Sequence, residues 1–147
     1  MSSLMEQLAQ SPKREAVVRD ACTVLNQEVA DKGGLSGLAI KGAFKLLEGI
    51  KPGFVTEVVD ALLNDFLTSL DPIYQEALER QVKPGAHLTA NGSRVADALL
   101  QVTDRKAEHA TRQAIKKTYE KLRPTAKKHV ESAVPRLAQL LERHAAS

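Results

Sequence analysis

The four histidines are the side chains of this chain most able to bind a metal or transfer a proton near neutral pH. They stand at His87, His109, His129 and His144, far apart in the sequence, and none has a second histidine at a ligand spacing. The Glu-x-x-His pairing that binds two irons inside a helical bundle is absent from the sequence. We therefore expect surface histidines and no metal site.

Glu57 and Asp60 share one side of an expected helix with Asn64, an arrangement that superficially resembles a hydrolytic pair. That side lies opposite the apolar residues of the helix, so a solvated polar face is the better interpretation. The only cysteine, Cys22, falls on an apolar stripe, which predicts a buried and unreactive thiol. We expect no catalytic residues and no cofactor, although a fixed pocket lined by converging polar groups would favour an enzyme.

The glycine-rich stretch 33–37 precedes an expected helix, and the free amide groups at a helix start can hold an anion. The stretch has neither a preceding strand nor the lysine and serine that end a phosphate-binding loop. A helix stop followed by a tight turn explains the same residues and is the better interpretation.

Charge is distributed unevenly along the chain. Residues 1–71 contain seven Lys and Arg against ten Asp and Glu, whereas residues 72–147 contain fourteen against eight. The excess is greatest between residues 105 and 128, where only Glu108 and Glu120 oppose nine basic residues. These nine are Arg105, Lys106, Arg112, Lys116, Lys117, Lys121, Arg123, Lys127 and Lys128. On one helix, at about 100° per residue, most of them share one side, which predicts a basic amphipathic helix.

A basic helix of this kind fits an acidic macromolecule, either a protein or a nucleic acid, because both carry a high density of negative charge. No aromatic residues are interleaved with the lysines, so recognition of single strands by base stacking is not expected. We therefore predict a binding protein without catalytic activity. A merely solubilising face is an equally simple interpretation, and the acidic N-terminal half could also contact the basic helix, within one chain or between two copies.

The alternative partner is an anionic membrane surface, contacted through the glycine-rich amphipathic segment 35–54. This segment combines a wide apolar sector with lysines, a combination that suits the interface between water and lipid.

The elements expected to position these residues are all helical. Proline and glycine positions predict helices over 12–32, 35–50, 54–70, 72–82, 93–123 and 124–146, with an irregular stretch at 85–93 and a kink at Pro135. The 35–50 helix is apolar around much of its circumference, so it is expected to be central and to form the core with 54–70. Its core face would hold Leu35, Leu38 and Leu46 among others.

Length and composition support one all-α domain over 1–147, an irregular bundle of five to seven helices with a flexible segment at 1–10. The chain has 147 residues, of which 43% are hydrophobic and only 3% aromatic. A single cysteine, no visible signal peptide and no long apolar run predict a cytoplasmic location.

Four segments together resemble a family of small, uncharacterised bacterial helical proteins. They are GLSGLAIKGAFK at 34–45, IKPGF at 50–54, VADALL at 95–100 and KLRPTAKKH at 121–129. The resemblance implies a bacterial, cytoplasmic origin and assigns no activity, cofactor or site residue.

Overall fold

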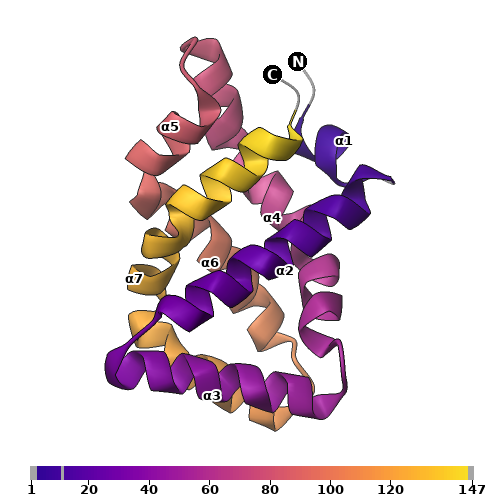
Figure 1. The fold of residues 1–147 in the computed structure, drawn as a ribbon, viewed down its shortest axis with the longest axis vertical. Helices are drawn as coiled ribbons and strands as arrows, with labels where there is room; N and C mark the ends of the chain where they lie inside the picture. The colour runs from indigo at the N-terminus through magenta and orange to yellow at the C-terminus, as the bar shows by residue number, and fades with distance from the viewer. Residues whose placement is uncertain (1–2, 11, 146–147) are drawn as a thin grey trace.

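The computed structural model describes residues 3–10 and 12–145, and within these ranges it contains seven helices and no strand. The helices are α1 (Leu4–Leu8), α2 (Lys13–Asp31), α3 (Gly34–Ile50), α4 (Phe54–Glu79), α5 (Pro84–Ala90), α6 (Gly92–Glu108) and α7 (Gln113–His144). They pack into one irregular bundle in which α3 lies across the lower end and α5 stands at the upper end (Figure 1). The prediction of an all-α fold with five to seven helices is confirmed.

The hydrophobic core is built by α1, α2, α4, α5, α6 and the second half of α7. Its large, fully buried side chains come from helices far apart in the sequence: Leu4, Leu8, Leu70, Leu88 and Leu141. No residue of α3 and none of the first half of α7 belongs to this cluster. The core therefore lies toward the upper part of the molecule, away from the end that α3 covers.

Within the segment expected to be flexible, 1–10, the residues Leu4–Leu8 form helix α1. Ser3 caps this helix by accepting a hydrogen bond from the Glu6 N–H at 3.1 Å. Leu4 and Leu8 are fully buried, and the Leu4 N–H donates to the Asp71 carboxylate at 2.9 Å. Residues 1 and 2 lie outside the described residues. The two buried leucines hold α1 against α4. The helix propensity of so short a segment does not predict this stabilisation by packing.

The prediction that 35–50 and 54–70 together form the core is wrong for 35–50. Helix α3 buries only Gly37 and Ala43, whereas Leu35 is 87% and Leu38 is 67% exposed. The side of α3 that faces the bundle carries Ile40, Phe44 and Leu47, all half-buried. Because α3 is apolar nearly all round, the pattern could not tell which side faces inward.

Proline ends fewer helices here than the sequence predicts. Helix α4 continues through Pro72 to Glu79, and α7 contains both Pro124 and Pro135. All three prolines are exposed, so water can reach the carbonyl groups that lose their hydrogen bonds. Buried residues follow Pro72 on the same helix, and their packing favours continuation over a break.

Two further boundaries differ from the expected ones. The stretch expected to be irregular, 85–93, contains α5, which begins at Pro84 in the first helical position. The helix expected over 93–123 is divided, because α6 ends at Glu108 and α7 begins at Gln113. Residues 109–114 contain no large apolar side chain that would hold a continuous helix against the bundle.

Candidate functional site: the basic and apolar surfaces around α3

The nine predicted basic residues lie on two helices and the link between them. Arg105 and Lys106 are in the last turn of α6, Arg112 caps the start of α7, and the other six follow in the first half of α7. Their interactions divide them into three residues with ion-pair partners and six without one.

Three of the nine are neutralised by acids of the chain itself. Arg123 binds Asp104 of α6 through two contacts, Nε to Oδ1 at 2.9 Å and Nη2 to Oδ2 at 3.2 Å. Lys127 forms a 3.1 Å ion pair with Asp97 of α6, and Lys106 lies 3.7 Å from the carboxylate of Asp65 in α4. These three cations join helices and do not form a free docking surface.

The Asp104 carboxylate also accepts a hydrogen bond from the Tyr119 hydroxyl, which is 2.7 Å from the Thr103 hydroxyl. Hydrogen bonds from Arg123 and Tyr119 lower the pKa of Asp104. Burial, followed by the bond to Asp104, raises the pKa of Tyr119 to about 12. The cluster is a structural link between α6 and α7.

The remaining six cations make no ion pair within residues 3–10 and 12–145: Arg105, Arg112, Lys116, Lys117, Lys121 and Lys128. Three of them, Lys117, Lys121 and Lys128, fall within about 40° of one another around α7 and are exposed. We call these three the outer lysine row. It points away from the side of α7 that carries Arg123 and Lys127.

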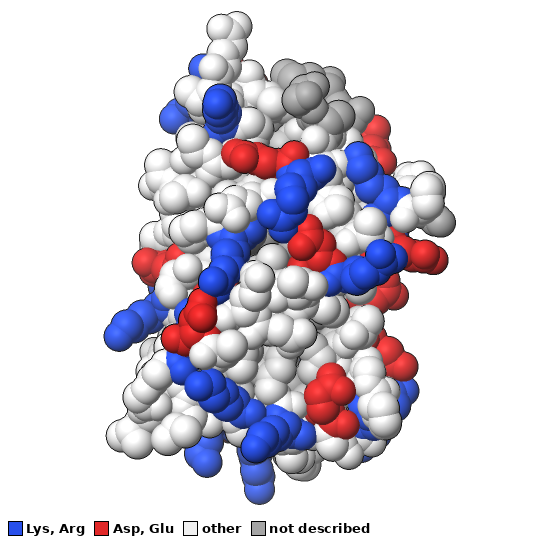
Figure 2. Space-filling model, viewed as in Figure 1, with Lys and Arg blue, Asp and Glu red and all other residues white. Residues whose placement is uncertain are grey.

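A second exposed surface lies on α3 and is apolar. Its residues span about 100° of the helix at about 100° per residue, and we call them the α3 strip. They are Leu35, Leu38, Ala39, Gly42, Leu46 and Gly49, all exposed. Lys41 and Lys45 are exposed along one edge of the strip, and neither makes an ion pair within the described part of the chain. Lys and Arg side chains gather at this lower end, over α3 and directly below it (Figure 2).

Few polar interactions tie α3 to the bundle. Glu48 accepts hydrogen bonds at 3.2 Å from the backbone N–H groups of Gly53 and Val55, and so caps the start of α4, whose own cap residue is glycine. A glycine with positive φ stands beside each end of α3. Gly34, the first residue of α3, has a φ of 70°, and Gly53, in the link to α4, has a φ of 79°. The strip is thus held on a helix with two glycine-containing ends.

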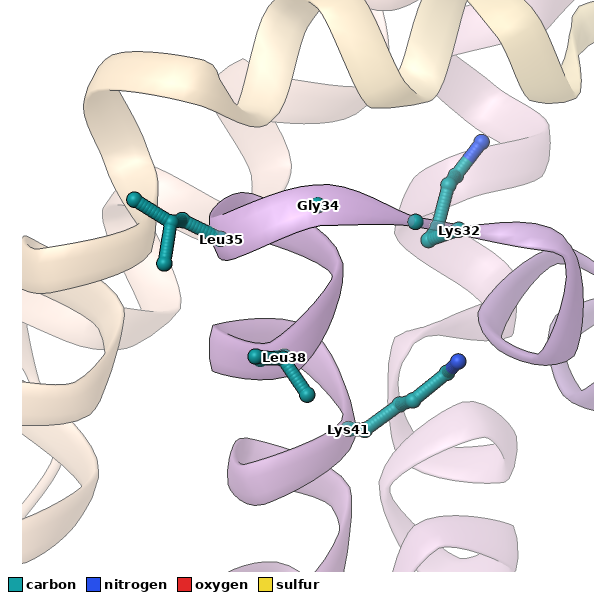
Figure 3. A pocket seen from close by; sticks show the side chains of 6 residues that line it. Lys32, Gly34, Leu35, Leu38 and Lys41 are labelled. Carbon is teal, nitrogen blue, oxygen red and sulfur yellow. The ribbon is translucent and has the colours of Figure 1, made fainter.

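Two open hollows flank the start of α3. The first, of about 420 Å³, is lined by Lys32, Gly33, Gly34, Leu35, Leu38 and Lys41. In Figure 3 the amines of Lys32 and Lys41 lie on one side of the first turns of α3, and Leu35 points to the other. The second hollow, of about 480 Å³, shares Lys32 and Gly33 and reaches α7 at Lys128 and His129.

Lys32 stands between the hollows and has a fixed position. Its ammonium donates to Glu28 and to Ser132, each at 2.9 Å. Glu28 also accepts from Arg136 at 2.7 Å, so one buried carboxylate joins the end of α2 to α7. These hydrogen bonds of Lys32 and Glu28 hold the α2–α3 link beside α7.

The histidines mostly serve structural contacts. His87 lies 2.7 Å from the Glu76 carboxylate, and His144 lies 2.9 Å from the Asp20 carboxylate. His109 Nδ1 lies 2.8 Å from the carbonyl of its own helix at Arg105. His129 Nε2 is buried and has no hydrogen-bond partner among the residues that the structure describes. Burial together with nearby Lys32 and Lys128 lowers the His129 pKa.

The residues considered for catalysis also make structural contacts. Asp60 and Asn64 both accept from the Arg14 guanidinium, at 3.0 and 2.7 Å, which joins α2 to α4. Glu57 pairs with Lys51 at 2.9 Å, and half-buried Cys22 packs beside the core. Within residues 3–10 and 12–145, no group of three His, Cys, Asp or Glu is placed to hold a metal.

Sequence reasoning did identify the outer lysine row and the segment that contains the α3 strip. The sequence pattern did not reveal that the α3 strip is exposed. It also did not reveal that Arg123, Lys127 and Lys106 form ion pairs with acidic residues of the chain. Asp97 and Asp104 stand just before the basic stretch, and their spacing from Lys127 and Arg123 is the signal of a helical hairpin.

The fold and its surfaces define an all-helical protein with an exposed apolar strip and unpaired lysines at one end. The chain belongs to a family of unknown function (DUF6918), whose model matches residues 4–145. This confirms the expected membership of a family without an assigned activity. Searches of curated proteins and of solved structures found no match. In the described part of the chain, no helix has the length and apolar character to cross a bilayer.

Proposed function

We propose that this protein binds the anionic surface of a membrane through α3, as a peripheral protein without catalytic activity. The observation that carries the proposal is the exposure of Leu35 and Leu38, 87% and 67%, beside unpaired Lys41 and Lys45. An amphipathic helix with leucines on one face and lysines beside it is the usual form of an interfacial helix.

The free energies expected for transferring leucine and lysine side chains to an anionic membrane favour membrane binding by α3. Burying a leucine side chain that is exposed in water contributes about 1.5–3 kcal/mol. Each lysine close to an anionic membrane surface adds about 1 kcal/mol. Leu35, Leu38 and Leu46 with Lys41 and Lys45 therefore supply enough gross energy for reversible binding, and the leucines contribute the larger part.

An acidic macromolecule is the second candidate partner, and the outer lysine row supports it. Lys117, Lys121 and Lys128 are exposed, lie on one side of α7 and form no ion pair with any residue that the structure describes. The row is shorter than the nine-residue face expected from the sequence, because Arg123 and Lys127 bind α6. A partner bound there would also leave the α3 strip exposed to water, whereas a membrane covers it.

The test compares vesicle binding of a double variant within α3 with that of a single control variant outside α3. We expect the protein to float with vesicles that contain phosphatidylglycerol and not with vesicles of phosphatidylcholine alone. Replacing Leu35 and Leu38 by Gln should lower binding at least tenfold with no change in thermal unfolding, because both side chains are exposed. Val82→Gln is the control, since Val82 is 44% exposed and lies outside α3.

The opposite result identifies the other partner. If the Leu35→Gln/Leu38→Gln variant floats as the wild type does, the α3 strip is not the docking surface. Loss of binding to a polyanion only in Lys117→Glu/Lys121→Glu would then favour an acidic macromolecule. The bacterial origin and cytoplasmic location expected from the sequence would place the membrane contact on the inner face of a bacterial membrane.

A further inference from the structure

The first hollow, at the start of α3, combines two ammonium groups with an apolar wall. Among the described residues, its lining contains Lys32 and Lys41 and no acidic side chain. Both amines lie on the same side of the first turns of α3 (Figure 3). The hollow thus has a cationic side and an apolar side within one space of about 420 Å³.

Both lysines keep donors available for an anion. An ammonium group has three donors, and Lys32 uses two of them, on Glu28 and Ser132. Lys41 is exposed and makes no hydrogen bond or ion pair with any described residue. Lys32 is held in place by its contacts, while Lys41 is free to close on a ligand from the next turn of α3.

The surroundings of the hollow are positive. The two hollows share Lys32 and Gly33, and their linings hold four cationic side chains against two acids, a net charge of +2. Glu28 is bound by both Lys32 and Arg136, and Asp31 is bound by Arg136. The lowered pKa of His129, caused by burial and by Lys32 and Lys128, reflects the same field. A negative group is therefore favoured near Lys32.

The apolar wall indicates what must accompany the negative group. Leu35 and Leu38 are the two most exposed large apolar residues of the described chain, and both border the hollow. Free phosphate would leave these side chains in water, whereas the glycerol and first acyl carbons of a lipid would cover them.

We propose that this hollow holds the phosphate of one anionic phospholipid between Lys32 and Lys41, with the start of its acyl chains over Leu35 and Leu38. The inference rests on the proposed membrane binding and gives it a specific lipid site. A zwitterionic choline head binds more weakly, because its quaternary ammonium is repelled by the same two lysines.

The test uses a short-chain lipid below its micelle concentration, so that binding does not require a surface. Dihexanoyl phosphatidylglycerol is titrated into the full chain while the amide NMR signals of 32–41 are followed. We compare Lys41→Ala with Lys45→Ala, because both lysines are exposed on α3 and only Lys41 lines the hollow. Lys41→Ala should weaken binding at least tenfold and Lys45→Ala less than twofold.

Leucine variants provide a second matched pair. Leu38→Ala should weaken binding of the short-chain lipid about fivefold, and Leu46→Ala should leave it unchanged, since Leu46 lies on the strip but outside the hollow. Dihexanoyl phosphatidylcholine and inorganic phosphate are the ligand controls. Inorganic phosphate that binds as tightly as the lipid would overturn the proposal, because the hollow would then be an anion site without lipid selectivity.

Failure of this proposal differs from failure of the proposed function. If Lys41→Ala and Lys45→Ala weaken vesicle binding equally and the short-chain lipid does not bind, the hollow is not a lipid site and α3 binds membranes as a diffuse surface. If neither vesicles nor the short-chain lipid bind, both proposals are overturned.

Discussion

Arg123 and Asp104 form a two-contact ion pair, at 2.9 and 3.2 Å, that joins the first half of α7 to the end of α6. Lys127 and Asp97 repeat the pairing at 3.1 Å, about one turn further along α7 and about two turns back along α6. Residue numbers that rise on α7 and fall on α6 show that the two helices are antiparallel. The pairing neutralises two of the predicted basic residues, which stay partly exposed, and gives them a structural role.

Charge reversal should separate the paired cations from the outer lysine row. Arg123→Glu/Lys127→Glu should lower the free energy of unfolding by about 1–3 kcal/mol, because two ion pairs are lost and like charges then face each other. Lys117→Glu/Lys121→Glu changes the net charge equally and should alter it by less than about 0.5 kcal/mol. Urea unfolding measures both. Equal losses in the two variants would contradict the division into paired cations and the outer lysine row.

Two glycines of α3 should respond to alanine with opposite sign. A Cβ at Gly37 would lie 2.7 Å from the Lys32 carbonyl carbon and 2.8 Å from its oxygen, so the link or the helix must move. We expect Gly37→Ala to destabilise α3 by about 1–3 kcal/mol. Gly42 has open space around it, and Gly42→Ala should stabilise α3 by about 0.5–1 kcal/mol through helix propensity. Native-state hydrogen exchange of the α3 amides gives both values.

If Gly37→Ala protects the α3 amides as well as Gly42→Ala does, the close approach of α3 to the α2–α3 link is not present in solution. Vesicle binding of Gly42→Ala supplies a further check. The added methyl group is small and apolar, so binding should stay within twofold of the wild type.

Acid should weaken the contact between α4, α5 and α6 at Glu76. Hydrogen bonds from Arg94 and then from His87 lower the Glu76 pKa from 4.5 to about 2. Because the folded-state pKa lies below the unfolded one, the ionised carboxylate stabilises the fold above pH 4.5, and this stabilisation is lost as the pH falls toward 2. The stability difference between wild type and Glu76→Gln should therefore shrink over that interval. Urea unfolding at pH values from 7 to 2 tests this, and a constant difference would contradict it.

Local signals in the sequence were sufficient for the helical class and for several boundaries, but not for the inward side of α3. The Lys51-Pro52-Gly53 break is present, as predicted, because glycine there adopts a positive φ that ends one helix and begins the next. The apolar sector of α3 is wide, so its orientation depends on long-range packing. Helix α3 packs against α2, α4 and α7. Ile40, Phe44 and Leu47 are half-buried, whereas Leu35 and Leu38 are left exposed.

The site was only partly predictable for a related reason. Lysines 117, 121 and 128 were identified as basic-face residues, and segment 35–54 as a membrane alternative. The ion pair between Arg123 and Asp104 is not predictable from the expected elements, because a continuous helix over 93–123 keeps both residues on one helix, where they cannot meet. A turn at 109–112 brings them together, and no proline or glycine marks that turn.

The central claim is that Leu38 enters the membrane interface when the protein binds. Cys22 is the only cysteine, so Cys22→Ser/Leu38→Cys accepts one environment-sensitive fluorophore at the α3 strip. Cys22→Ser/Ala86→Cys places the fluorophore at an exposed position of α5, at the other end of the molecule (Figure 1). With phosphatidylglycerol vesicles, the fluorophore at position 38 should shift to shorter emission wavelength and resist iodide quenching, while that at position 86 should not. Vesicle-bound protein whose fluorophore at position 38 stays fully quenched would contradict the account.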